Sequence, residues 1–292
     1  MSAEAAHASG HYYVPHGTQW PIMGSIGLFT TVFGAAIWLE DMVFGKYLFV
    51  LGLLIVLGMM FGWFGTVIRE SEGGMYNAQV DRSFRWGMSW FIFSEVMFFG
   101  AFFGALFYAR VFVQPWLGGG SNSLFTNLVL WKGYEPAWPS NGPANVGGDF
   151  EAMKATGIAA LNTLILLTSG LTVTIAHWGL KEGNRKKLCW FLLFTVILGF
   201  SFVVLQAHEY IEAYTKQNLT LASGIYGSTF FMLTGFHGLH VTIGAIMLTI
   251  ILLRALKGHF RPDHHFAFEA VSWYWHFVDV VWLGLYIFVY WL

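Results

Sequence analysis

Long apolar stretches alternate with polar breaks along this chain. Seven of these stretches stand out, at residues 22–39, 47–68, 85–112, 157–178, 188–210, 226–256 and 266–291. A helix needs about 20 apolar residues to cross a bilayer, and each stretch approaches or exceeds that length. None alternates with period two, as a barrel strand would, so each predicts a transmembrane helix. We therefore expect an all-α membrane protein, with a polar tail at residues 1–20 and a single seven-helix domain at residues 21–292.

The composition supports a membrane protein and removes several other classes. Only 11% of the residues are charged, whereas soluble domains carry about 25%. The net charge of −1 gives no electrostatic support for nucleic-acid binding. The single cysteine, Cys189, excludes an intrachain disulfide and a cysteine-based metal cluster. The N-terminal tail lacks the charged start and apolar centre of a signal peptide.

The basic residues predict an orientation. With seven crossings, ten of the fifteen Lys and Arg residues fall on the side that also holds the N-terminus. Because positive charge accumulates on the cytoplasmic side, we expect the N-terminus inside and the C-terminus outside. Small residues spaced by four, Gly58 with Gly62 and Gly100 with Gly104, predict close helix approach.

The third apolar stretch contains a carboxylate in a costly place. Glu95 lies ten residues after Arg85, which puts it ~15 Å into the bilayer at the rise of an α-helix. A charge at that depth costs at least a few kcal/mol unless it is neutralised or paired. Its sequence neighbours are mostly aromatic and apolar and offer no obvious partner. A functional and a structural role for Glu95 are both open.

Eleven histidines raise the question of a metal or haem site. His237 and His240 share one face of the sixth stretch, and Glu269, His276 and Asp279 fall in the seventh. We interpret these five residues as a hydrogen-bond network between helices, with no metal and no catalytic residue. His177 and His264–His265 fall near a membrane boundary, where histidine needs no ligand role. The string from His208 to Glu212 starts like a zinc-protease motif, but its second histidine is absent.

Ordered strings along nearly the whole chain resemble cytochrome c oxidase subunit III. The strings are Val67–Ser71, Ser94–Phe99, Leu161–Thr163, Ala176–His177, Glu182–Lys186, Gly227–Phe231, Gly235–His240, His264–Phe266, Phe268–Ala270 and Trp273–Trp282. The resemblance implies a non-catalytic subunit of an oxidase that reduces O2 to water while pumping protons. Haem and copper would belong to the partner subunits I and II. This chain would interact with cytochrome c only through the complex.

The resemblance also implies site residues. Helices 1–2 and helices 3–7 would form a V-shaped cleft filled with phospholipid, with Glu95 as the buried carboxylate beside it. Trp63, Arg69, Glu70 and Arg254 would contact lipid headgroups. The subunit would stabilise subunit I and support proton uptake or O2 access.

Some positions depart from the mitochondrial members of that family. Gly74–Tyr76 replace a histidine pair, Phe64 and Gly65 replace a tryptophan and a basic residue, and the loop at residues 114–154 is longer. These differences predict a bacterial plasma membrane in preference to the mitochondrial inner membrane. Two alternatives come from the residues alone: a b-type cytochrome that binds haem through its histidines, and a proton-coupled transporter that uses Glu95.

Overall fold

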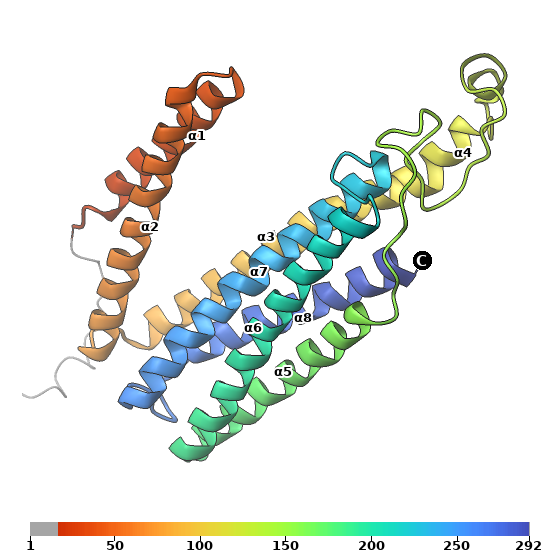
Figure 1. The fold of residues 1–292 in the computed structure, drawn as a ribbon. Helices are drawn as coiled ribbons and strands as arrows, with labels where there is room; N and C mark the ends of the chain where they lie inside the picture. The colour runs from red at the N-terminus through yellow and green to blue at the C-terminus, as the bar shows by residue number, and fades with distance from the viewer. Residues whose placement is uncertain (1–16, 292) are drawn as a thin grey trace, which may run out of the picture. The chain divides into compact units, whose positions relative to one another are not determined.

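The computed structural model describes residues 17–291, and eight α-helices lie within them (Figure 1). The predicted tail falls mostly outside the described residues. The α-helices are α1 (Trp20–Leu39), α2 (Val43–Glu72), α3 (Ala78–Tyr108), α4 (Gln114–Leu117), α5 (Ile158–Lys181), α6 (Arg185–Lys216), α7 (Gly224–Lys257) and α8 (Phe266–Leu285). Three short π-helical segments accompany them, namely η2 (Ala109–Val113), η3 (Thr126–Leu130) and η4 (Tyr286–Trp291).

Six helices of the described chain are long and apolar enough to cross a membrane: α1, α2, α3 with its continuation to Leu117, α5, α6 and α7. The all-α membrane class is thereby confirmed. The seventh predicted crossing, α8, is absent from this group although it has the same length as α1. The reason is composition, because α8 contains Glu269, His276 and Asp279 along with four Trp and Tyr residues.

The chain forms two compact units, divided between Phe84 and Arg85. The first contains the α1–α2 hairpin, whose two helices meet through glycine. A side chain at Gly34 would run into the backbone of Leu48 and Phe49, and one at Gly52 would run into Thr31. Only glycine allows backbones to approach this closely.

The predicted glycine contacts are wrong in most positions. A side chain added at Gly58, Gly100 or Gly104 would meet no protein atom within 4 Å, while one at Gly62 would meet the ring of Trp20. Glycines spaced by four residues therefore did not identify the close helix contacts. Those contacts occur at Gly34 and Gly52, between α1 and α2.

The second unit is a bundle around α5, α6, α7 and α8 (Figure 1). Trp275 and Trp282 on α8 are fully buried at its centre. Their indole N–H groups donate to Ser169 Oγ and Thr163 Oγ1 of α5, each at 2.9 Å. A buried indole needs such an acceptor, so these two bonds fix the position of α8 along α5.

Helix α3 packs against this bundle through large side chains. Phe98 meets Phe236 of α7 edge to face at 5.0 Å between ring centroids, and Phe91 stacks on Tyr274 of α8 at 6.2 Å. Edge-to-face and offset rings are the favoured aromatic arrangements. Some of the aromatic residues near Glu95, among them Phe98 and Phe99, thus pack α3 against the bundle, while others such as Trp90 are exposed.

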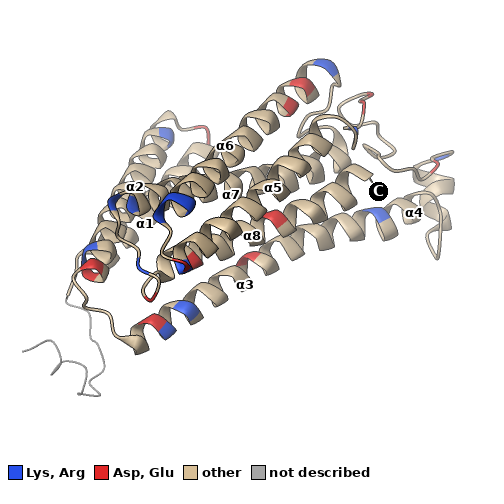
Figure 2. Cartoon of the chain, turned by 90° about the horizontal axis from the view of Figure 1, so that it is seen from below, with Lys and Arg blue, Asp and Glu red and all other residues tan. Residues whose placement is uncertain are grey.

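The long predicted loop contains two short helices, α4 and η3, and is otherwise irregular up to Ile158. It is fastened to the α6–α7 connection, because Asn218 donates to the carbonyls of Gly147 and Asp149 at 3.2 and 2.9 Å. Lys and Arg residues gather at helix ends and loops, and long middle sections of the helices are uncharged (Figure 2). This distribution is typical of helices that cross a bilayer.

Candidate functional site

Glu95 forms a hydrogen bond with a histidine 145 residues further along the chain. Its Oε2 lies 2.9 Å from Nε2 of His240 on α7. The other ring nitrogen, Nδ1, lies 2.6 Å from the carbonyl oxygen of Phe236. A carbonyl only accepts, so Nδ1 must carry a proton. Both residues are mostly buried, with 21% and 11% of their side chains exposed.

This geometry makes the pair electrically neutral. With Nδ1–H fixed, the bond between Nε2 and Glu95 contains one further proton. If that proton is on Glu95, both groups are neutral; if it is on His240, an ion pair forms. In both states the net charge is zero, which removes most of the cost of a lone carboxylate inside a membrane. The apolar wall is aromatic, with the Phe99 ring 5.0 Å from that of His240.

The other predicted network residues have separate partners. His237 Nε2 lies 3.2 Å from the Val278 carbonyl oxygen, and His276 Nε2 lies 3.3 Å from Thr174 Oγ1. The Asp279 carboxylate faces Gly170 of α5, where an added side chain would lie 2.7 Å from Oδ2. The structure thus places each of these side chains at a helix–helix contact within the second unit. Their role as one network stays a prediction.

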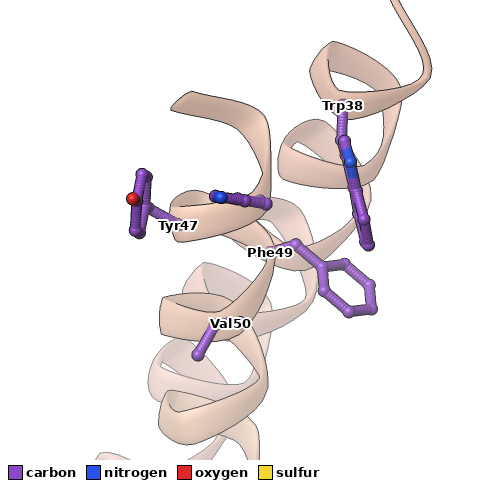
Figure 3. A pocket seen from close by; sticks show the side chains of 5 residues that line it. Trp38, Tyr47, Phe49 and Val50 are labelled. Atoms are coloured by element: carbon purple, nitrogen blue, oxygen red, sulfur yellow. The ribbon is translucent and has the colours of Figure 1, made fainter. Parts of the chain in front are cut away.

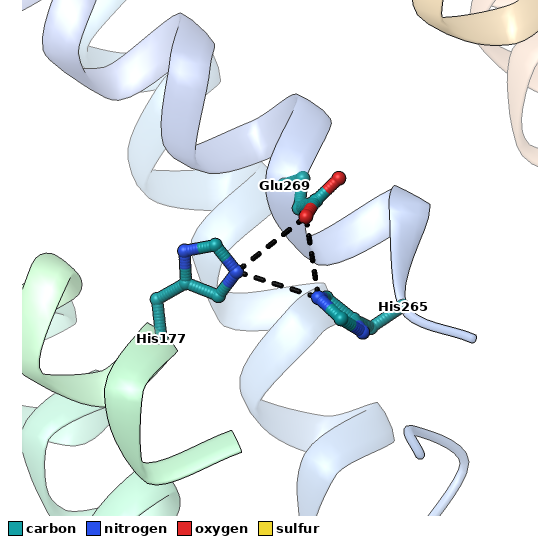
Figure 4. A group of neighbouring side chains, drawn as sticks. All are labelled: His177, His265 and Glu269. Carbon is teal, nitrogen blue, oxygen red and sulfur yellow. Dashed lines mark hydrogen bonds and ion pairs between the residues drawn. The ribbon is translucent and has the colours of Figure 1, made fainter. Parts of the chain in front are cut away.

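Glu269 belongs to a different cluster, at the start of α8 (Figure 4). Its Oε1 lies 3.2 Å from His265 Nε2 and 3.6 Å from His177 Nε2, and the two histidine nitrogens lie 3.4 Å apart. Arg85 of α3 binds Oε2 of the same carboxylate. The cluster therefore joins α3, α5 and α8 at one end of the bundle.

The sequence does not predict this cluster, because Arg85 and His177 are far from Glu269 along the chain. The donor atoms of His177, His265 and Glu269 lie within 4.8 Å of one another, a spacing that could hold a metal ion. The Arg85 guanidinium already neutralises the carboxylate, so the cluster is satisfied as an ion-paired helix contact.

Glu269→Gln tests this cluster. We expect it to destabilise the second unit by about 1–3 kcal/mol, because it removes the charge-assisted bond between the Arg85 guanidinium and the Glu269 carboxylate. The measurement is the midpoint of thermal unfolding in detergent. Glu182→Gln is the control: Glu182 is exposed and pairs with Lys187 at 3.0 Å, so its loss should cost well under about 1 kcal/mol. Equal midpoints for the two variants would contradict the role assigned to Glu269.

The predicted lipid contacts lie in both units. On α2, Arg69 donates to Thr66 Oγ1 at 3.1 Å, and Glu70 accepts from the Tyr76 hydroxyl at 2.7 Å. Trp63 stacks on its neighbour Phe64 and is 49% exposed. Arg254, on α7 of the second unit, lies over the Phe260 ring at 4.8 Å. Their shared role as lipid contacts stays a prediction.

An apolar hollow of about 470 Å³ lies at the turn of the α1–α2 hairpin (Figure 3). It is lined by Trp38, Lys46, Tyr47, Phe49 and Val50. It contains none of the predicted lipid residues. Lys46 lies over the Tyr47 ring at 5.1 Å, an arrangement suited to the water boundary of a membrane.

The sequence did not single out a further buried carboxylate. Glu209 on α6 is fully buried, and its Oε2 accepts from Gln206 Nε2 at 2.8 Å and from the Tyr290 hydroxyl at 2.9 Å. A signal is present, since Gln206 and Glu209 are spaced i, i+3 and share a face of α6. The resemblance of this stretch to a zinc-protease motif drew attention to His208, which is exposed.

The fold and these clusters define an all-helical, multi-pass membrane protein in which Glu95, Glu209 and Glu269 bond to polar groups of other helices. A protein-family model described as cytochrome c oxidase subunit III matches residues 10–125 and 136–292. "Cytochrome c oxidase subunit 3" of Drosophila melanogaster is 43% identical over 288 residues, covering 98% of each chain. The protein of the same name from Squalus acanthias is 42% identical over 287 residues, again covering 98% of each. The chain belongs to the cytochrome c oxidase subunit III family.

Membership confirms the predicted function. The chain is a core, non-catalytic subunit of the respiratory cytochrome c oxidase, and the other subunits of that complex are its partners. Its family carries no metal centre itself. The haem-cytochrome and transporter alternatives are therefore set aside. The relatives named above come from animals, so the bacterial source stays a prediction.

Proposed function

We propose that the chain crosses a bacterial plasma membrane seven times, with its N-terminus in the cytoplasm and its C-terminus outside. Six apolar spans alone would leave both ends on one side, so the proposal depends on α8 with η4 as the seventh. The buried positions of Trp275 and Trp282 support it, because a helix surrounded by α5, α6 and α7 needs less apolar surface than one facing lipid. The ten-to-five division of basic residues points the same way.

In this proposal the subunit stabilises subunit I and supports proton uptake or O2 access. It holds phospholipids in a V-shaped cleft between the first two spans, α1 and α2, and the other five, α3 and α5–α8. Subunits I and II supply haem and copper, and cytochrome c is met only through them. Exposed apolar side chains support a role in packing against lipid or protein. Phe61 of α2 and Trp90 of α3, for example, are 72% and 64% exposed.

The observation that carries the proposal is the neutral pair of Glu95 and His240. A lone transmembrane carboxylate would suggest a carrier or a reaction centre. Glu95 instead shares one proton with a histidine that is itself anchored to the Phe236 carbonyl. Such a pair fixes α3 against α7 without net charge. We infer that it tunes the surface that the subunit offers to lipid and to subunit I.

Glu95→Gln in the assembled oxidase tests this inference. The amide can still donate to His240 Nε2 but cannot share a proton with it. We expect an unchanged haem spectrum and initial turnover rate, weaker phospholipid retention, and fewer turnovers before inactivation.

The control is Glu212→Gln, on α6, where the carboxylate pairs with Lys216 at 2.9 Å and lies far from α3 in sequence. Its lifetime and lipid content should match the parent enzyme. Loss of haem from the Glu95 variant, or equal lifetimes for both variants, would contradict the proposal.

A further inference from the structure

A group of buried polar side chains crosses the second unit near the Lys216 end of α6. We call it the polar layer, and each of its members is less than one-tenth exposed. It consists of Asn162 on α5, Gln206 and Glu209 on α6, His237 on α7 and Tyr290 on η4.

Helix register places these residues at one height. Helices α5 and α6 run antiparallel, and Thr172 Oγ1 meets Thr195 Oγ1 at 2.8 Å. Asn162 lies ten residues before Thr172 on α5. In an antiparallel pair it therefore lies at the same position along the bundle axis as residue 205 of α6, which is ten residues after Thr195 and adjacent to Gln206. Because α6 and α7 are also antiparallel and Tyr210 bonds to Thr234 at 2.6 Å, His237 stands level with residue 207.

Contacts with α8 place the layer in the same region. His237 Nε2 bonds to the Val278 carbonyl, and its ring centroid lies 5.0 Å from that of Trp282. Trp282 donates to Thr163, the residue after Asn162. The layer is therefore enclosed by four helices and η4.

The hydrogen bonds in this layer are incomplete. Glu209 accepts from Gln206 Nε2 and from the Tyr290 hydroxyl, both at Oε2, as described above. No protein group bonds to Gln206 Oε1, to either polar atom of the Asn162 amide, or to His237 Nδ1. These four are half of the eight such buried side-chain atoms in the described part of the chain, and they lie at one height.

Buried polar atoms without a partner are unfavourable, and native proteins usually satisfy them with internal water. The chemistry of these atoms also favours water. The Asn162 amide offers both a donor and an acceptor, and Gln206 Oε1 is an acceptor. A metal cation would require acceptors throughout, whereas water both donates and accepts.

We propose that the polar layer is an internal water site, in which ordered water molecules bridge Asn162, Gln206 and His237 and hydrate the Glu209 carboxyl. Glu95 and Glu209 are then two carboxyl groups of the bundle with different partners. Glu95 has an imidazole on α7, and Glu209 has a phenol, an amide and water.

The direct test is a density map of the intact oxidase at a resolution that shows ordered water. We expect peaks at hydrogen-bonding distance, about 2.7–3.2 Å, from the Asn162 amide and from Gln206 Oε1. The absence of such peaks, with the Asn162 amide bonded to protein groups instead, would overturn the proposal.

A variant gives an independent reading. Asn162→Leu keeps the approximate volume but removes the partners of the water, so we expect the peaks to vanish and the unfolding midpoint to fall by several degrees. Thr168→Val on the same helix is the control, because Thr168 is exposed and bonds only to its own helix at Leu164. If Asn162 has no water partner, its replacement should leave the midpoint unchanged or raise it, and either result would overturn the proposal.

Discussion

Trp275→Ala is expected to cause a large loss of stability, about 3–5 kcal/mol, as is typical when a buried tryptophan is truncated. The Trp275 ring is fully buried and fills the space beside Gly199 on α6 and Gly244 on α7. A side chain at either glycine would lie 2.8 Å from the ring, so the two helices fit closely around it. The truncation also leaves Ser169 Oγ without its indole partner.

The measurement is the temperature at which the detergent-solubilised oxidase loses this subunit. Trp190→Ala is the matched control, because Trp190 on α6 is 61% exposed and its removal leaves no cavity in the bundle. The Trp275 variant should lose the subunit many degrees below the control. Similar temperatures for the two would show that Trp275 is not the centre of the bundle.

Gly34→Leu is expected to separate α1 from α2. Its side chain would overlap the backbone of Leu48 and Phe49, and a backbone cannot move aside as a flexible side chain can. The overlap must be relieved by parting the helices along the hairpin, at a cost of at least 1–3 kcal/mol, roughly the range for overpacking. Increased proteolysis of the loop between α1 and α2 in the purified oxidase would report the separation.

Gly58→Leu is the control for this change. It adds the same side chain to the same hairpin and gains the same helix propensity, but no protein atom lies within 4 Å of the added group. We expect it to resist proteolysis like the parent. The same cleavage rate in both variants would contradict the assigned helix contact.

The sequence was informative about helices and poor at pairing them. Apolar length located six spans because the bilayer sets that length, and it also located α8, whose buried face is rich in aromatic residues. It did not identify the partner of Glu95, because His240 is 145 residues away and only tertiary packing brings it near. The same holds for Arg85 and Glu269, which are separated by 184 residues.

The sequence strings that resemble the subunit III family identified some of the residues that take part in these contacts. They named Glu95, His240 and Glu269 as residues to watch, but a string gives no distance and no partner. Glu209 shows the limit most clearly, because it lies in a string that starts like a zinc-protease motif but lacks the second histidine. Its partner Tyr290 is 81 residues away, in a π-helical segment that periodicity does not predict.

The central claim is that this chain is a non-catalytic subunit whose buried polar groups serve packing and a partner's chemistry. The most direct test is to remove it from the purified oxidase with detergent and to record haem absorbance and turnover in both fractions. We predict that all haem absorbance stays with the remaining subunits, which start at a near-normal rate but inactivate after fewer turnovers. A haem absorbance band that follows the isolated chain, or a depleted oxidase with an unchanged lifetime, would contradict the claim.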